Sequence, residues 1–213
     1  MKPDSEKKVL IAYHAHCIDG FTSAWACWRG LLGTTSVFTG NIDFIEMTYD
    51  QQVALKNVAV DYDDIYIVDF SVSPEDLKLL ASVSEIVMID HHKTAIEKYV
   101  EFNKLINAEV VFNTNECGAS LVWKYFFPAK PLPHLIQCVR DYDLWRFEFS
   151  YSKDVNKVLR LEKKDVINWQ RLEGVFEDPS KLHRLVESGR AMSAYHNSVV
   201  KELVEQAEEC TLN

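Results

Sequence analysis

The segment "DIYIVDFSVSPEDLKLLASVSEIVMIDHH", residues 64–92, carries the strongest signal for the fold. Two apolar runs within it, residues 64–70 and 84–90, have the length and the branched side chains of buried strands. Residues 73–83 lie between them and have the pattern of a helix, with Ser73 as its cap and Pro74 at its first position. A strand, a helix and a strand in this order are typical of a right-handed unit with two parallel strands.

The same alternation continues on both sides of this segment. Further strands are predicted at residues 7–13, 43–49 and 108–113, and further helices at 21–33 and 95–105. After about residue 115 the pattern is helical only, at residues 117–127, 134–145 and 150–162 and in a long final helix at about 180–209. We therefore predict an α/β fold: a mostly parallel five-stranded sheet flanked by helices, followed by a helical segment that ends in a long helix. We expect residues 1–213 to form a single catalytic domain, with an α/β core at 1–115 and a helical part at 116–213.

Composition and charge limit the class of protein. The chain has 213 residues, of which 47% are hydrophobic and 26% charged, as in ordinary globular proteins. It contains no apolar run long enough to span a bilayer, and its polar start, "MKPDSEKK", does not resemble a signal peptide. The five cysteines include no CxxC pair, which favours reduced thiols and a cytoplasmic location. The net charge of −9 predicts no binding of long duplex nucleic acid and no membrane partner.

Histidine and aspartate side chains follow three of the predicted strands. His14 ends the first, Asp69 ends the third, and Asp90, His91 and His92 end the fourth. Parallel strands present their carboxyl ends at one edge of the sheet, so these side chains are expected to converge there. A single aspartate at a strand end is more often a turn or cap residue, and it is the convergence that favours a binding site.

The loop "HAHCIDGF" adds Asp19 to the same edge, with Gly20 allowing a tight turn. Mixed imidazole and carboxylate ligands suit divalent ions such as Mn²⁺, Fe²⁺ or Co²⁺. Ca²⁺ and Mg²⁺ prefer sites made of oxygen ligands alone. Several carboxylates also allow one of them to bridge two ions, an arrangement that activates water toward phosphorus.

Five short motifs resemble the DHH phosphoesterase superfamily. They are "YHAHCIDGFTSAWA" (13–26), "IVDFS" (67–71), "VMIDHHKT" (87–94), "NECGASLVW" (115–123) and "VRDYDLWRF" (139–147). The resemblance covers the alternating part and extends into the helical part. It implies a two-metal hydrolase, usually manganese-dependent, that cleaves phosphodiester or phosphoanhydride bonds. Mg²⁺ or Co²⁺ are the alternatives to two Mn²⁺ ions.

The resemblance also implies roles for individual residues. His14 would hold one ion, Asp19 and His91 the other, and Asp69 would bridge them. An aspartate of "RDYD" would complete the second site, with Asp141 favoured and Asp143 as the alternate. In the catalytic set, Asp90 would orient an imidazole, His92 would face the scissile phosphate as a proton donor, and Lys93 would meet a phosphate.

Two departures from the family pattern stand out. Cys17 occupies the position of the first aspartate of an Asp-x-Asp motif. It could ligate as a thiolate, be replaced in that role by His16, leave the first metal weakly held, or act as a small hydrophobe. Many members continue past the long helix into a substrate-binding domain, whereas this sequence ends at "EECTLN". The resemblance thus implies a compact version or a catalytic fragment without that domain.

Further contacts to substrate are expected from a few residues outside the metal set. His16 and Arg140 are candidates, Arg140 either to neutralise developing charge or to pair with Asp141. Gly118 and Ser120, at the start of a predicted helix, could offer backbone amides to an anion. Trp145 is the tryptophan expected to stack on a base.

These features favour a phosphohydrolase acting on a small phosphoester or a short oligonucleotide. The alternatives are a catalytically silent metal-binding module with a regulatory or scaffold role, and a pyrophosphatase or phosphomonoesterase. Apolar positions along the final helix, with no second domain to cover them, further suggest a homo-oligomer formed through this helix.

Overall fold

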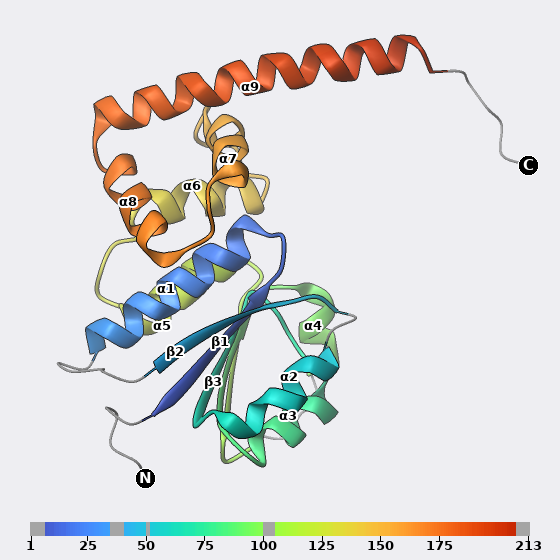
Figure 1. Ribbon diagram of the computed structural model, residues 1–213, viewed down its shortest axis with the longest axis vertical. Helices are drawn as coiled ribbons and strands as arrows, with labels where there is room; N and C mark the ends of the chain where they lie inside the picture. Colours follow the sequence, from blue (N-terminus) through green and yellow to red (C-terminus); the bar gives the residue numbers. More distant parts are fainter. Residues whose placement is uncertain (1–6, 35–40, 50–51, 100–104, 208–213) are drawn as a thin grey trace, which may run out of the picture.

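The centre of the protein is a sheet of five parallel strands in the order β2-β1-β3-β4-β5 (Figure 1). The structure, a computed structural model, describes residues 7–34, 41–49, 52–99 and 105–207. The strands are β1 (Lys8–His14), β2 (Asn41–Met47), β3 (Asp64–Val68), β4 (Glu85–Asp90) and β5 (Ala108–Phe112). Every neighbouring pair is parallel, so the predicted sheet is confirmed.

Helices cover both faces of the sheet. The helices α1 (Ile18–Thr34) and α5 (Gly118–Phe126) cover one face, while α2 (Gln52–Val58), α3 (Pro74–Ala81) and α4 (Lys93–Lys98) lie on the other side (Figure 1). In β1, Val9 and Ile11 pack in the core beneath α1, whereas Leu10 and Ala12 pack in the core beneath α2 and α3. Because both faces are buried at the centre of the sheet, β1, β3 and β4 are mostly apolar, which made them recognisable in the sequence.

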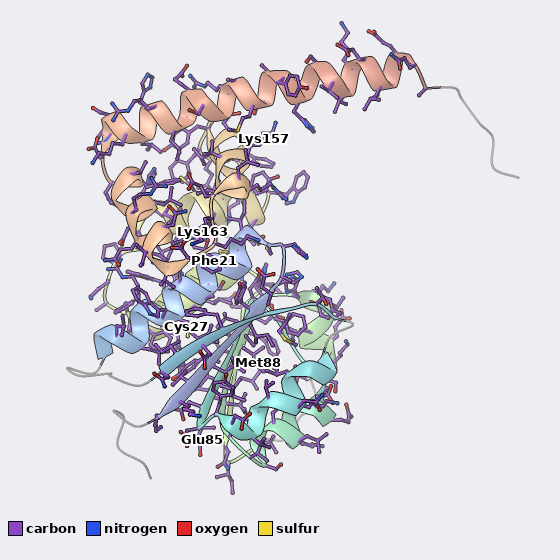
Figure 2. All side chains as sticks on the ribbon, viewed as in Figure 1. Phe21, Cys27, Glu85, Met88, Lys157 and Lys163 are labelled. Atoms are coloured by element: carbon purple, nitrogen blue, oxygen red, sulfur yellow. The ribbon has the colours of Figure 1, made fainter. Side chains whose placement is uncertain are left out.

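The helical part packs on the outer side of α1. It consists of α6 (His134–Asp143), α7 (Ser152–Leu161), α8 (Val166–Phe176) and α9 (Pro179–Glu205). Phe21 of α1, labelled in Figure 2, meets Trp169 of α8 edge to face, with ring centroids 4.8 Å apart. The indole N–H of Trp169 donates to the Thr22 hydroxyl at 3.1 Å. One hydrophobic cluster therefore continues from the sheet into the helical part.

The predicted long final helix is confirmed as α9, which runs past α7 and projects beyond the rest of the fold (Figure 1). Its projecting half exposes apolar side chains, among them Tyr195, Val200, Leu203 and Val204. None of the helices that the structure describes is long and apolar enough to cross a membrane. The expected division into parts at residue 115 and the single-domain organisation remain predictions.

The structure corrects several local predictions. The helix α1 begins at Ile18 and not near residue 21, so Asp19 and Gly20 lie in its first turn. The turn that precedes it is made by His16, which has φ 55°, and no described glycine has a positive φ. Gly20 is needed for space, because a Cβ there would lie 2.2 Å from the His14 carbonyl oxygen.

Other elements differ from the prediction in extent. The helix expected at 95–105 is described as the shorter α4, and residues 100–104 lie outside the described part. The helices α2 and α8, and the short 3₁₀ helix η2 (Ala59–Asp61), were not predicted from the pattern. The described cysteines Cys17, Cys27, Cys117 and Cys138 are free thiols, and Cys210 lies outside the described residues.

Candidate metal centre

The order of the strands places the polar strand ends beside a crevice. The connection that leaves β1 leads to β2 on one side of it, whereas the connection that leaves β3 leads to β4 on the opposite side. The connections part above the carboxyl ends of β1 and β3, where open α/β sheets bind ligands. His14 is the last residue of β1, Asp69 directly follows β3, and His91 directly follows β4.

Asp69 lies at the centre of this group and is 1% exposed. Its Oδ1 atom is 3.1 Å from Nε2 of His91, and its Oδ2 atom is 3.7 Å from Nδ1 of His14. The backbone of Asp69 has φ 53°, and its N–H donates to the Ile89 carbonyl at 2.9 Å. A left-handed non-glycine residue is uncommon, and such strain clusters at functional sites. The carboxylate of Asp69 thus faces one imidazole with each oxygen.

Asp19 reaches the same centre from the first turn of α1, and α5 holds it there. The backbone amides of Gly118 and Ala119 donate to its two carboxylate oxygens at 2.6 and 3.0 Å. Both amides belong to the N-terminal turn of α5, whose dipole favours a negative charge. Oδ2 of Asp19 lies 3.7 Å from Nε2 of His91. The amides at the start of α5 therefore bind the Asp19 carboxylate.

The two aspartates of "RDYD" have different positions. Asp143 is half-buried, and its Oδ2 atom lies 3.7 Å from Nε2 of His91. Asp141 is 3% exposed, and its carboxylate accepts N–H bonds from Glu148 and Phe149 at 2.7 and 3.2 Å. The structure therefore brings Asp143 to the centre, and the preference for Asp141 does not agree with this placement.

Asp90 lies behind the two histidines and is fully buried. It accepts hydrogen bonds from the Ser71 hydroxyl at 2.5 Å and from the His91 backbone N–H at 2.7 Å. Its Oδ1 atom also lies 2.7 Å from Nδ1 of His92. This contact fixes the orientation of the His92 ring and leaves Nε2 as its free nitrogen.

Crowding of carboxylates shifts the acid–base behaviour of the centre. Burial alone would lower the pKa of His91, but contact with Asp69 and the charges of Asp19 and Asp143 raise this pKa to about 9. Burial alone would raise the pKa of Asp69, but the neighbouring imidazoles of His14 and His91 lower this pKa to about 2. Burial and the carboxylates of Asp69 and Asp143 raise the pKa of Asp19 well above its usual range. Protons thus offset negative charge in the metal-free centre.

Three overlapping groups of residues could hold metal ions. His14, Cys17 and Asp69 form one set, and Asp19, His91 and Asp143 form another. The third group, Asp69, Asp90, His91 and His92, includes the Asp90 carboxylate that already binds Ser71 and the His91 backbone. In each set, one ligand atom per residue lies within 4.8 Å of the others. In Cys17, burial and the nearby Asp69 and Asp19 carboxylates raise the pKa of the thiol, so the thiolate needs a cation beside it.

The residues fit a divalent cation. Nδ1 of His14 and Oδ2 of Asp69 face each other, and neither has a hydrogen-bond partner within the described residues. Such orphaned buried polar atoms are rare in proteins, and a cation between them would satisfy both. The nitrogen and oxygen donors suit ions such as Mn²⁺ or Co²⁺, and the softer Cys17 thiolate is the donor least suited to Mn²⁺.

A cavity of about 270 Å³ opens beside the centre. One wall is the segment from His14 to Asp19, and the opposite wall comes from α6 and α7 through Tyr142, Asp143, Asn156 and Arg160. His16 is exposed and lines this cavity, and its contact with substrate remains a prediction. Tyr142, Asn156 and Arg160 were not singled out in the sequence, because only the packing of α7 against α6 places Asn156 and Arg160 there.

The remaining candidates have other partners. Arg140 lies 3.1 Å from the Glu116 carboxylate, so it pairs with that acid and not with Asp141. Ser120 is fully buried, and its hydroxyl donates to Glu116 at 2.7 Å. The amide of Gly118 is engaged by Asp19, so the structure does not offer it to a ligand. Lys93 is exposed at the start of α4, directly after the histidines.

No protein-family model matches this chain. An uncharacterized protein of Acanthamoeba polyphaga mimivirus is 23% identical over 204 residues, which is 92% of this chain and 47% of that protein. The structure of RecJ from Thermus thermophilus in complex with Mn²⁺ is similar over 94% of this chain and 37% of that chain, with 13% identity and a TM-score of 0.45. An exopolyphosphatase-related protein from Bacteroides fragilis is similar over 85% and 56%, with 13% identity and a TM-score of 0.40.

The chain therefore spans about half the length of the curated relative that it matches. The likeness to the two solved structures extends over most of this chain, which carries the DHH-like pair His91-His92 beside Asp90 and Asp69.

Proposed function

We propose that this protein is a metal-dependent phosphohydrolase that cleaves a phosphodiester or phosphoanhydride bond. The observation that carries the proposal is the placement of Asp69 between the two ligand sets. One of its oxygens faces His91 and the other faces His14, as required of a carboxylate that bridges two cations. The motifs shared with DHH phosphoesterases support the same reaction class.

Two Mn²⁺ ions are the cofactors that we propose, with Mg²⁺ or Co²⁺ as alternatives. His14 and Cys17 would hold one ion, Asp19, His91 and Asp143 the other, and Asp69 both. When bound, such a pair lowers the pKa of water and stabilises negative charge on the phosphoryl oxygens. The two α5 amides that bind Asp19 keep this carboxylate in place beside His91.

We assign the transfer of a proton to the leaving oxygen to His92. Its Nδ1 is held by Asp90 at 2.7 Å, so Nε2 is the atom that can donate. The hydrogen bond to Asp90 raises the pKa of His92, which favours the protonated form needed by a general acid. Asp90 acts as a positioning residue, because its buried carboxylate also binds Ser71 and the His91 backbone.

The size of the cavity favours a small substrate. About 270 Å³ accommodates a phosphoester group with its nearest substituents, and the exposed cation Arg160 lines the cavity. We propose a small phosphoester or a short oligonucleotide as the substrate class.

Hydrolysis of bis(p-nitrophenyl) phosphate in the presence of Mn²⁺ tests the proposal. We expect turnover that chelation abolishes and that Asp69→Asn lowers by more than about 100-fold, since even the outer partners of metal ligands typically contribute about 10–100-fold. The control is Asp61→Asn, at an exposed aspartate of η2, which should retain wild-type turnover.

Three results would redirect the proposal. Tight metal binding without turnover of any phosphoester would favour the silent regulatory or scaffold module. Turnover of pyrophosphate or a phosphomonoester alone would favour the pyrophosphatase or monoesterase alternative. Equal turnover by Asp69→Asn and wild type would contradict the assignment of this centre.

A further inference from the structure

The loop between α6 and α7 presents an exposed tryptophan on a strained backbone. Trp145 is 78% exposed, and its ring packs edge to face on Phe147, with centroids 5.6 Å apart. Both residues have a positive φ, 54° for Trp145 and 52° for Phe147. For bulky aromatic residues this is a true outlier, which persists only where the surroundings hold it in place.

Asp141 holds this loop in its strained conformation. Its carbonyl oxygen accepts the N–H of Arg146 at 3.0 Å, and its carboxylate accepts the N–H groups of Glu148 and Phe149. The fold thus uses a buried acid to keep the large indole of Trp145 in solvent, although burial would stabilise it.

The neighbouring face of α7 is cationic. Lys153, Lys157 and Arg160 lie four and then three residues apart, so they share one side of the helix. The Lys153 ammonium lies 4.1 Å from the centroid of the Phe147 ring. Within the described part of the chain, the side chains of Lys157 and Arg160 form no ion pair or hydrogen bond. Lys157 is labelled on α7, below α9, in Figure 2. In a chain with a net charge of −9, this face is a local concentration of positive charge.

This face is continuous with the metal centre. Tyr142, Trp145, Phe147, Lys153 and Lys157 line a cavity of about 170 Å³. Tyr142 also lines the cavity beside the centre, together with Asp143 and Arg160. A single residue, Leu144, separates Asp143 from Trp145. Arg160 thus lines the cavity beside the centre, Lys157 lines the second cavity, and Tyr142 lines both.

We propose that the α6–α7 loop and the cationic face of α7 form a subsite for a short single-stranded nucleic acid. A base stacks on Trp145, and backbone phosphates contact Lys157 and Arg160. This rests on the proposed function, because it makes a nucleobase-bearing strand the substrate of the same centre. An inorganic polyphosphate could contact the cations but has no base to stack on the exposed indole. Stacking of bases on aromatic rings is the usual basis of single-strand binding.

The test compares two fluorescein-labelled pentamers by anisotropy with the Mn²⁺-loaded protein. One is phosphorothioate pentathymidylate, and the other has the same backbone with abasic tetrahydrofuran residues. Wild type should bind the base-bearing pentamer about tenfold more tightly, as expected for stacking of one base. Trp145→Ala should remove most of this preference and Trp145→Phe should retain part of it. The matched control is Tyr195→Ala, at an aromatic residue of α9 that is 73% exposed.

The cationic face has a separate readout. Lys157→Ala should weaken the binding of both pentamers equally. It should also reduce the slope of log affinity against log salt concentration by about 0.7, which corresponds to the loss of one phosphate contact. Equal affinity of wild type for both pentamers, no detectable binding of either, or an unchanged preference in Trp145→Ala would overturn the subsite.

The two proposals can fail separately. Turnover of bis(p-nitrophenyl) phosphate without a preference for the base-bearing pentamer would support the proposed hydrolase and contradict the proposed subsite. A base preference that depends on Trp145, without any turnover, supports the subsite and contradicts the hydrolase.

Discussion

Gly118→Ala tests the packing of α5 against the metal centre. A Cβ at this position would lie 2.6 Å from Cβ of Asp69 and 2.8 Å from the Ser23 hydroxyl oxygen. Carbon atoms in contact are normally about 3.5–4.0 Å apart, so the first turn of α5 must move by about 1 Å. That movement also lengthens the 2.6 Å hydrogen bond from the Gly118 amide to Asp19.

The size of the effect follows from these contacts. Overpacking of a core costs about 1–3 kcal/mol, and weakening a hydrogen bond to a charged group adds up to about 2 kcal/mol. Alanine recovers at most about 1 kcal/mol through its helix propensity. We therefore expect a net destabilisation of about 2–3 kcal/mol and a Mn²⁺ affinity at least about tenfold lower, because Asp69 and Asp19 shift together.

Urea unfolding without metal and calorimetric titration with Mn²⁺ measure the two effects. The matched control is Gly174→Ala in α8, where a Cβ meets no atom within 4 Å. It should be neutral or slightly stabilising and should leave metal affinity unchanged. Equal stability and equal Mn²⁺ affinity of the two variants would show that α5 does not pack closely against Asp69 and Asp19.

Three further predictions concern other parts of the molecule. Asp141→Asn should destabilise the protein by about 1–3 kcal/mol in urea unfolding and speed hydrogen exchange at the Glu148 and Phe149 amides. The reason is that the NH₂ group of asparagine cannot replace the second carboxylate oxygen as an acceptor of an N–H bond. Unchanged exchange would contradict the role of Asp141 in anchoring the loop. Because the pKa of His91 is raised to about 9 in the metal-free protein, this imidazole is protonated at pH 7 and must lose its proton to bind metal. Mn²⁺ affinity should therefore rise by up to about tenfold per pH unit from pH 7 to 9 and then level off, with proton release seen by calorimetry in two buffers; a flat profile would argue against His91 as a ligand. The exposed apolar residues of α9 should make the protein self-associate at micromolar concentration, and Leu203→Glu should prevent this; sedimentation of wild type as a monomer would count against it.

The strands and their polar ends could be predicted because the relevant signals are local. Each buried strand is an apolar run, and His14, Asp69 and His91 lie where a run stops. Parallel pairing then brings these ends to one edge without further information. The helix α8 also carried a local signal that went unused, since Asp165 caps it and Trp169 and Phe176 lie on its buried side.

The remaining details depend on contacts between distant segments. Asp141 and Asp143 are two residues apart on α6, so they point about 200° apart around the helix, and only the packing of α6 decides which one faces His91. The role of Gly118 depends likewise on how closely α5 approaches Asp69. The turn at His16 was assigned to Gly20, because a left-handed histidine has no distinctive sequence signal.

Anomalous diffraction from crystals grown with Mn²⁺ tests the central claim most directly. A metal pair bridged by Asp69 should give two manganese peaks about 3.5–4 Å apart, with one oxygen of Asp69 on each. The first peak should lie beside His14, and the second beside His91 and Asp143. A single peak, or two peaks that do not share Asp69, would contradict the bridged pair on which the proposed hydrolysis depends.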